Sequence, residues 1–117
     1  MTVLLIVNDP PYGTEKAFNA LRLAITLQKE HPDIAVRMCL MGDAVGCAVP
    51  GQATPQGYYN VERMLRSVVT RGGAVKACGT CLDARGLADL PLVDGIERST
   101  MTELAAWVAS SDKMLSF

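Results

Sequence analysis

Two cysteines, Cys78 and Cys81, lie three residues apart in the segment "KACGTCLDARG" at residues 76–86. Such a Cys-x-x-Cys pair can form a disulfide, supply half of a metal site, act as a dithiol redox couple or provide one sulfur nucleophile beside a second thiol. Cys78 stands where a short predicted strand passes into a turn. Backbone N–H groups of that turn can point at its sulfur and favour the thiolate. Cys78 is therefore the candidate nucleophile, and the role of Cys81 stays open.

Small and charged residues around the pair favour a functional site. Lys76 precedes Cys78 by two residues, so it shares the strand face of Cys78 and is expected to add positive potential beside the sulfur. Gly79, Thr80 and Arg85 flank the cysteines. A lone cysteine in a strand is usually a small packing residue. The second cysteine and these neighbours weaken that alternative here.

Polar residues follow two of the other predicted strands. Asn8 and Tyr12 belong to "NDPPYG", and Asp43 belongs to "GDAVGC". Because ligands of open α/β sheets bind beyond the carboxyl ends of the strands, we expect these residues to meet the cysteine pair at one edge of the sheet. Helix capping and turn closure are the simpler roles for the three side chains.

The remaining cysteines and the single histidine do not complete a metal site within one chain. Zinc takes four ligands, and one Cys-x-x-Cys pair supplies two. Cys39 lies inside a predicted strand, where packing is its expected role, and His31 lies in a solvent-facing turn, unsuited to a Ser-His-Asp triad. Cys47, in a loop, is either a resolving thiol for Cys78 or an ordinary loop residue. We therefore expect no bound metal and no cofactor.

Composition limits the partners of the chain. Its 11 basic and 12 acidic residues give a formal net charge of −1 with no basic run, so nucleic acid is not an expected partner. No segment approaches the ~18 apolar residues of a membrane span, and "MTVLLIV" lacks the basic region of a signal peptide. We expect a cytoplasmic protein with reduced thiols. Half of the residues are apolar, which in so small a domain indicates buried contacts between identical subunits.

Predicted strands and helices alternate along the chain. This alternation indicates one α/β domain over residues 1–117, with an open, mostly or wholly parallel sheet and helices on both faces. Apolar runs bounded by turn residues predict strands at 2–8, 34–41, 74–78, 95–99 and 113–117. Capping residues and helical spacing predict helices after Thr14, after Asn60 and after Thr100, with a short helical turn at 81–86. The segment 42–57 is predicted as a loop that begins with a short helix.

The last predicted helix opens with a capping box formed by Thr100 and Glu103. Apolar residues at helical spacing follow it, and they predict an inner face made of Met101, Leu104, Ala105 and Val108. We expect this face to pack on the sheet.

Five segments are distinctive as a set: "VLLIVNDPPYG", "LMGDAV", "GYYNVERML", "VKACGTCLDARG" and "DKMLSF". Together they resemble the DsrE/DsrF-like family along the whole chain, closest to its YchN-type branch. The resemblance implies a flavodoxin-like three-layer α/β fold with a five-stranded sheet, assembled into trimers or hexamers. In sulfur-relay members of the family, a cysteine in the position of Cys78 accepts a persulfide sulfur and passes it on. Those members typically have a residue other than cysteine in the position of Cys81, so this chain departs from them and agrees with the YchN-type branch.

Three functions follow from these observations. The first is a persulfide carrier, similar to a sulfurtransferase, that takes sulfur on Cys78 from a donor protein and delivers it to an acceptor protein. The second is a non-enzymatic ligand-binding or regulatory module whose pocket is formed by "NDPPYG" and residues 42–57. The third is a dithiol redox protein that uses Cys78 and Cys81.

Overall fold

Five parallel strands form the centre of the molecule. In this computed structural model, which describes residues 1–117, the strands are β1 (Thr2–Val7), β2 (Ala35–Leu40), β3 (Ala74–Cys78), β4 (Ile96–Ser99) and β5 (Lys113–Ser116). They form one sheet in the order β4-β3-β2-β1-β5, and every neighbouring pair is parallel. The strands lie within a residue or two of the segments predicted from the apolar runs.

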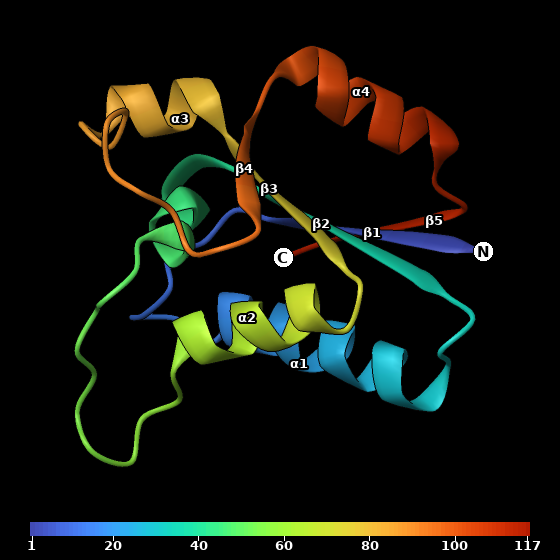
Figure 1. Ribbon diagram of the computed structural model, residues 1–117, viewed down its shortest axis with the longest axis horizontal. Helices are drawn as coiled ribbons and strands as arrows, with labels where there is room; N and C mark the ends of the chain where they lie inside the picture. Colours follow the sequence, from blue (N-terminus) through green and yellow to red (C-terminus); the bar gives the residue numbers. More distant parts are fainter.

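Helices cover both faces of the sheet, which confirms the three-layer α/β arrangement (Figure 1). The helices α1 (Lys16–Glu30) and α2 (Val61–Thr70) lie on one face, and α3 (Gly79–Ala84) and α4 (Met101–Ser110) lie on the other. A 3₁₀ helix, η1 (Gly42–Ala48), follows β2. Asn60 caps α2 as predicted, because its side chain accepts a hydrogen bond from the N–H of Arg63 at 3.0 Å. No helix is long and apolar enough to cross a membrane.

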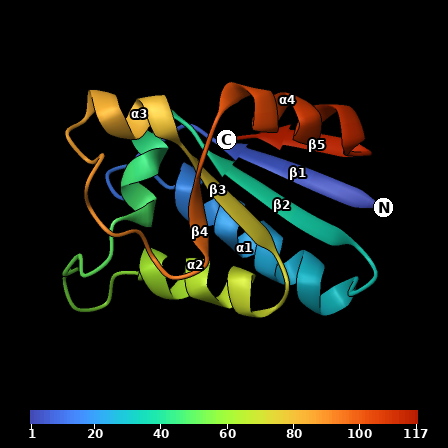
Figure 2. The same ribbon diagram turned by 45° about the horizontal axis from the view of Figure 1, so that its top comes forward.

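The connections between strands divide into two groups (Figure 2). The chain passes from β1 to β2 through α1 and from β2 to β3 through η1 and α2, whereas α4, on the opposite face, connects β4 to β5. Flavodoxin itself has the strand order 2-1-3-4-5, so the layers agree with the expectation while the order of strands is different. The strand order reverses between β1 and β5, while β2 and β3 are parallel neighbours whose carboxyl ends lie side by side, at the edge of the sheet where ligands of open α/β sheets bind.

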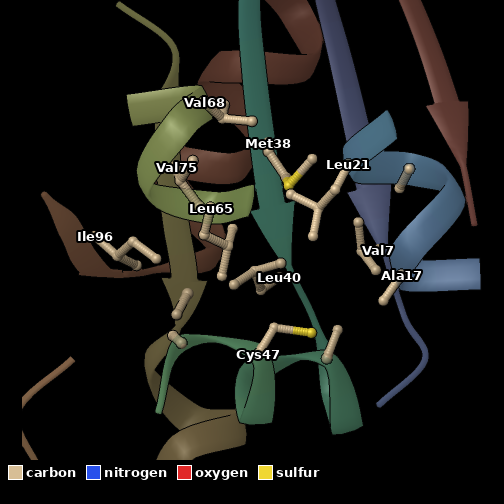
Figure 3. Packing of buried hydrophobic residues seen from close by; sticks show 14 of the residues in the cluster. Val7, Ala17, Leu21, Met38, Leu40, Cys47, Leu65, Val68, Val75 and Ile96 are labelled. Atoms are coloured by element: carbon tan, nitrogen blue, oxygen red, sulfur yellow. The ribbon is translucent and has the colours of Figure 1, made fainter. Parts of the chain in front are cut away.

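Most of the core lies between the sheet and the first two helices (Figure 3). Alternate residues of a strand point to opposite faces, so β1 and β2 direct every second apolar side chain towards α1 and α2. The largest of these side chains are Leu5, Met38 and Leu40, all fully buried, and Leu65 of α2 packs in the same cluster. This rigid layer holds β2 and β3 side by side.

The prediction for the inner face of α4 was wrong. The capping box is present, since the Thr100 hydroxyl accepts from the Glu103 N–H at 3.2 Å and the Glu103 carboxylate accepts from the Thr100 N–H at 3.1 Å. However, Ala105 is exposed, and Met101 and Val108 are 65% and 42% exposed. Only Leu104 and Trp107 are half-buried, so this helix leaves most of its apolar side uncovered in a single chain.

Charged strand residues explain why α4 presents Trp107 to the sheet. The Arg37 guanidinium and the Lys76 ammonium lie 5.6 Å and 5.0 Å from the centre of the Trp107 ring. Arg37 also donates hydrogen bonds to the Trp107 carbonyl and to the Ser110 hydroxyl, at the carboxyl end of the helix. Cation–π contacts of this kind favour an aromatic residue over an aliphatic one at the contact.

Candidate thiol site

Cys78 ends β3 and Cys81 lies in the first turn of α3. The Cys78 sulfur accepts a hydrogen bond from the Cys81 N–H at 3.3 Å, and the Thr80 hydroxyl lies 3.3 Å from the same sulfur. Both cysteines are free thiols. A larger residue between strand and helix would be crowded here, since a Cβ at Gly79 would lie 3.0 Å from the carbonyl oxygen of Ser99.

The two thiols of the pair are shifted in opposite directions. Burial opposes ionisation of Cys78, but hydrogen bonds from the Cys81 thiol, the Thr80 hydroxyl and the two backbone N–H groups outweigh it and lower the pKa of Cys78. Burial raises the pKa of Cys81, and its hydrogen bond to Cys78 adds to the rise, while the Gly42 N–H and Arg85 partly offset it. Cys78 is therefore the more acidic thiol of the pair, and Cys81 keeps its proton to a higher pH.

The start of η1 contacts the pair from the other side of the β2–β3 boundary. The Gly42 N–H donates to the Cys81 sulfur at 3.2 Å. Arg85 donates to the Cys81 carbonyl at 3.1 Å and forms an ion pair with Asp43 at 2.9 Å. Gly42 adopts φ +55°, a left-handed conformation that glycine reaches without strain. The structure thus brings Asp43, Arg85, Thr80 and the two cysteines together.

The contact between Gly42 and Cys81 is one that the sequence did not reveal. Its N–H reaches Cys81 across 39 positions in the chain. The one local signal is a glycine directly after a buried strand, in "LMGDAV", where the backbone can turn sharply. Only the pairing of β2 with β3 turns that signal into a contact.

Lys76 does not serve Cys78 in the way that the sequence suggested. It shares the face of Cys78, but its ammonium forms an ion pair with Glu103 at 3.5 Å and lies over the Trp107 ring. None of the interactions that lower the pKa of Cys78 comes from Lys76. The positive charge of Lys76 therefore interacts with α4 rather than with Cys78.

The side chains of Asn8 and Tyr12 hydrogen-bond to other parts of the chain than the thiols. The Asn8 amide donates to the Ser116 hydroxyl and to the Phe117 carbonyl, both at 3.2 Å, which fastens β1 to the end of β5. The Tyr12 hydroxyl accepts from the Val61 N–H at 3.0 Å, at the start of α2. Their contacts are those of capping and joining residues, the simpler roles named above.

Cys39 and Cys47 are each only 1% exposed. Burial raises the pKa of Cys39 to about 11, with a further rise from the nearby Cys78 and Cys81, and raises the pKa of Cys47 to about 12. Cys47 packs in the core beside α2 rather than in an open loop (Figure 3), which does not favour a resolving role. No three His, Cys, Asp or Glu side chains are placed to hold a metal ion together.

The two buried thiols predict a loss of stability at alkaline pH. Their folded pKa values lie above the ordinary value of 9.0, so with rising pH the unfolded chain loses these protons first. The unfolded state then binds fewer protons than the native state, and the free energy of unfolding falls by about 1.4 kcal/mol per pH unit for each thiol. Urea unfolding between pH 9 and about 11 should show this decrease in the free energy of unfolding with pH. In Cys47→Ala the decrease per pH unit should be smaller by the contribution of one thiol. An unchanged slope in that variant would contradict the assignment.

The sequence profile of the DsrE/DsrF-like family matches residues 1–117. The chain is also 44% identical over 115 residues to the protein YchN of Escherichia coli K12, which covers 98% of this chain and 97% of YchN.

The chain belongs to the DsrE/DsrF-like family.

Two further similarities agree with the family. The crystal structure of the ychN protein from E. coli superposes with a TM-score of 0.94 at 43% identity, covering 99% of this chain and 98% of that chain. An uncharacterised protein of Methanopyrus kandleri is 36% identical over 115 residues, covering 98% of this chain and 93% of that protein. The DsrE/DsrF-like fold is thereby confirmed, with α/β layers and an all-parallel sheet.

Proposed function

We propose that the protein accepts a persulfide sulfur on Cys78 and relays it to another thiol. One observation carries this proposal: the Cys78 sulfur lies at the carboxyl end of β3, within 3.3 Å of the Cys81 N–H and of the exposed Thr80 hydroxyl. A thiolate stabilised in this way is the attacking species in sulfur exchange. Cys78 is 9% exposed, against 1% for Cys39 and Cys47, so it is reachable where they are not.

The transfer is a displacement at sulfur. The Cys78 thiolate attacks the outer sulfur of a donor persulfide, R–S–SH, and a new S–S bond forms. The donor S–S bond breaks, and the donor leaves as the thiolate R–S⁻ with the bonding electron pair. Cys78 then carries –S–SH, which an acceptor thiolate can attack in the same way. The Thr80 hydroxyl and the Cys81 N–H hold the attacking sulfur as an anion until the donor arrives.

Two matched serine variants test this role. After incubation with glutathione persulfide and rapid desalting, Cys81→Ser is expected to gain the mass of one sulfur atom, mapped to Cys78 by peptide mass spectrometry. Cys78→Ser is expected to gain no sulfur on the peptide that contains residues 78 and 81. Loading of Cys78→Ser to the same extent as Cys81→Ser would exclude Cys78 as the acceptor.

A separate pocket supports the alternative function, a small-ligand module. It has a volume of about 390 Å³ and lies between the loop after β1 and the loop before α2, lined by Gly13, Thr14, Glu15, Gly57, Tyr58 and Tyr59. Tyr58 is exposed and packs edge-on against Tyr12, with ring centres 6.0 Å apart. No residue of the thiol site lines this pocket, so Tyr58→Ala should weaken binding of a small ligand there and leave persulfide loading on Cys78 intact.

We also propose that the chain assembles into a homo-oligomer, a trimer or a hexamer, through the α4–β5 surface. We define this surface by four exposed side chains, Met101, Val108, Met114 and Leu115. The two elements are adjacent (Figures 1 and 2), and β5 is an edge strand. Exposed apolar side chains concentrated in this way are typical of subunit contacts. Sulfur relay further requires reduced thiols, so the proposal includes a cytoplasmic location.

Light scattering combined with gel filtration tests the assembly. Val108→Lys together with Met114→Lys is expected to convert the oligomer to monomers, because it buries two charges in the contact. Leu90→Lys is the control, since Leu90 is similarly exposed but lies outside this surface. An unchanged mass in the double variant would exclude the α4–β5 surface.

A further inference from the structure

We infer that Cys81 resolves the persulfide formed on Cys78, so that the protein releases the accepted sulfur as sulfide and is left with a Cys78–Cys81 disulfide. This inference rests on the proposed loading of Cys78. It adds a second activity, the reduction of persulfide sulfur by the protein's own dithiol. It also gives a role to the one thiol that sulfur-carrying chemistry alone does not need.

The position of Cys81 favours an attack within the chain. Its N–H already donates to the Cys78 sulfur at 3.3 Å, within the turn that joins β3 to α3. Cys81 is half-buried and has the exposed Thr80 beside it, whereas Cys39 and Cys47 are enclosed. A thiol held this close reacts at a high effective concentration, ahead of a thiol that must diffuse in.

Contacts from outside the pair prepare Cys81 to ionise. The Gly42 N–H donates to its sulfur at 3.2 Å. The Arg85 guanidinium, anchored by Asp43 at 2.9 Å and by the Cys81 carbonyl at 3.1 Å, adds positive charge nearby. Both contacts act on Cys81 and neither acts on Cys78. The resolving thiol thus has its own stabilising groups.

The order of events follows from the charge on Cys78. Burial raises the pKa of Cys81, and its hydrogen bond to Cys78 and the negative charge of a Cys78 thiolate raise it further. Once Cys78 carries an extra sulfur, its negative charge moves to the outer sulfur atom, so the inner sulfur no longer opposes ionisation of Cys81. The Gly42 N–H and Arg85 remain in place. Loading therefore precedes and promotes resolution.

The resolving step balances without an external oxidant. Cys78–S–S⁻ and Cys81–SH give Cys78–S–S–Cys81 and HS⁻. The bond between the two cysteine sulfurs forms, the bond to the outer sulfur breaks, and the outer sulfur leaves with the electron pair and the Cys81 proton. The outer sulfur is reduced to sulfide and Cys81 is oxidised. A dithiol reductant is needed only to return the disulfide to two thiols for another turnover.

Sulfide release separates this inference from the loading step. Each reduced protein is incubated with one equivalent of glutathione persulfide, and the sulfide in the whole mixture is then trapped with monobromobimane, with a protein-free sample as the blank. Wild type is expected to release about one sulfide per loaded chain and to show a Cys78–Cys81 peptide disulfide. Cys81→Ser is expected to keep the sulfur on Cys78 and to release at least about tenfold less sulfide. Cys47→Ala, a second thiol deletion, should behave as wild type does.

The possible outcomes are distinguishable. If wild type keeps the persulfide on Cys78 as stably as Cys81→Ser does, the inference is wrong while the proposed function stands. If Cys81→Ser does not load at all, the proposed function fails and the inference with it. Sulfide release without a Cys78–Cys81 disulfide would also overturn the inference, because another thiol would then be the resolver. Equal urea midpoints for the variants would show that the differences do not arise from unfolding.

The rate and the pH dependence of sulfide release test whether Arg85 positions Cys81. Arg85→Gln removes the positive charge and the ion pair with Asp43. It is expected to slow sulfide release while the extent of loading on Cys78 stays as in wild type. The pH at which release reaches half its maximal rate should also rise, because the Cys81 thiolate loses a stabilising charge. An unchanged pH profile would assign Arg85 a purely structural role.

Discussion

Iodoacetamide at neutral pH is expected to label Cys78 at least about a hundred times faster than Cys39 or Cys47. The thiolate population is the first cause, since the pKa of Cys78 is lowered while those of Cys39 and Cys47 are raised to about 11 and about 12. At neutral pH this difference in pKa makes the thiolate fraction of Cys78 about a hundredfold larger. A more basic thiolate is a stronger nucleophile, which offsets about tenfold of that advantage. Burial restores the full difference in labelling rate, because Cys39 and Cys47 are each only 1% exposed and the reagent can hardly reach them.

Peptide mapping of the alkylated sites over time measures this ratio. Cys81 is expected to react at an intermediate rate, since it is more exposed than the buried pair but has a raised pKa. Thr80→Val removes the hydroxyl 3.3 Å from the Cys78 sulfur and should slow labelling of Cys78 alone. Comparable rates at Cys78 and Cys39 would mean that Cys78 is not an activated thiol.

Truncation of Leu5 to alanine is expected to lower the free energy of unfolding by about 2–5 kcal/mol. Leu5 is fully buried in β1, the strand between β2 and β5, and belongs to the main core cluster. The substitution removes apolar surface and leaves a cavity that the neighbouring strands cannot close. A loss of this size is a large part of the ~5–15 kcal/mol that stabilises an ordinary domain.

Urea unfolding monitored by the fluorescence of Trp107 measures this loss, and Leu90→Ala is the matched control. Leu90 is exposed in the irregular segment before β4, so its truncation should change the free energy of unfolding by less than about 0.5 kcal/mol. Both variants should be compared at one protein concentration, because assembly stabilises the folded chain by mass action. Equal effects at the two leucines would contradict the placement of Leu5 in the core.

Much of the candidate site could be predicted because its determinants are local. Cys78 was expected at a strand end and Cys81 in the turn after it, and both lie there. Thr80 is adjacent to the sulfur for the same reason. Arg85 is close to the pair in sequence, and it contacts the Cys81 carbonyl because it caps the short helix that contains Cys81. Neighbours within one turn need no tertiary information to be brought together.

The misplaced residues depend on distant parts of the chain. Lys76 was assigned to Cys78 from strand alternation, which fixes its face but not the neighbour that its ammonium meets there. The inner side of α4 was assigned from apolar spacing, but the strand face beneath it offers Arg37 and Lys76 to an aromatic ring. Apolar periodicity marks a buried side only when the surface opposite is apolar as well.

The amino-acid sequence by itself determined the alternation of strands and helices, the parallel α/β class and the place of Cys78 at a strand end, because apolar runs, caps and turn residues act over a few positions. The tertiary structure alone decided that β2 lies beside β3 and that η1 and α3, which follow these strands, contact each other. That arrangement carries Gly42 and Asp43 to Cys81 and Arg85. The four thiols also owe their different pKa values to the tertiary structure, since burial and hydrogen bonding are properties of the packed chain.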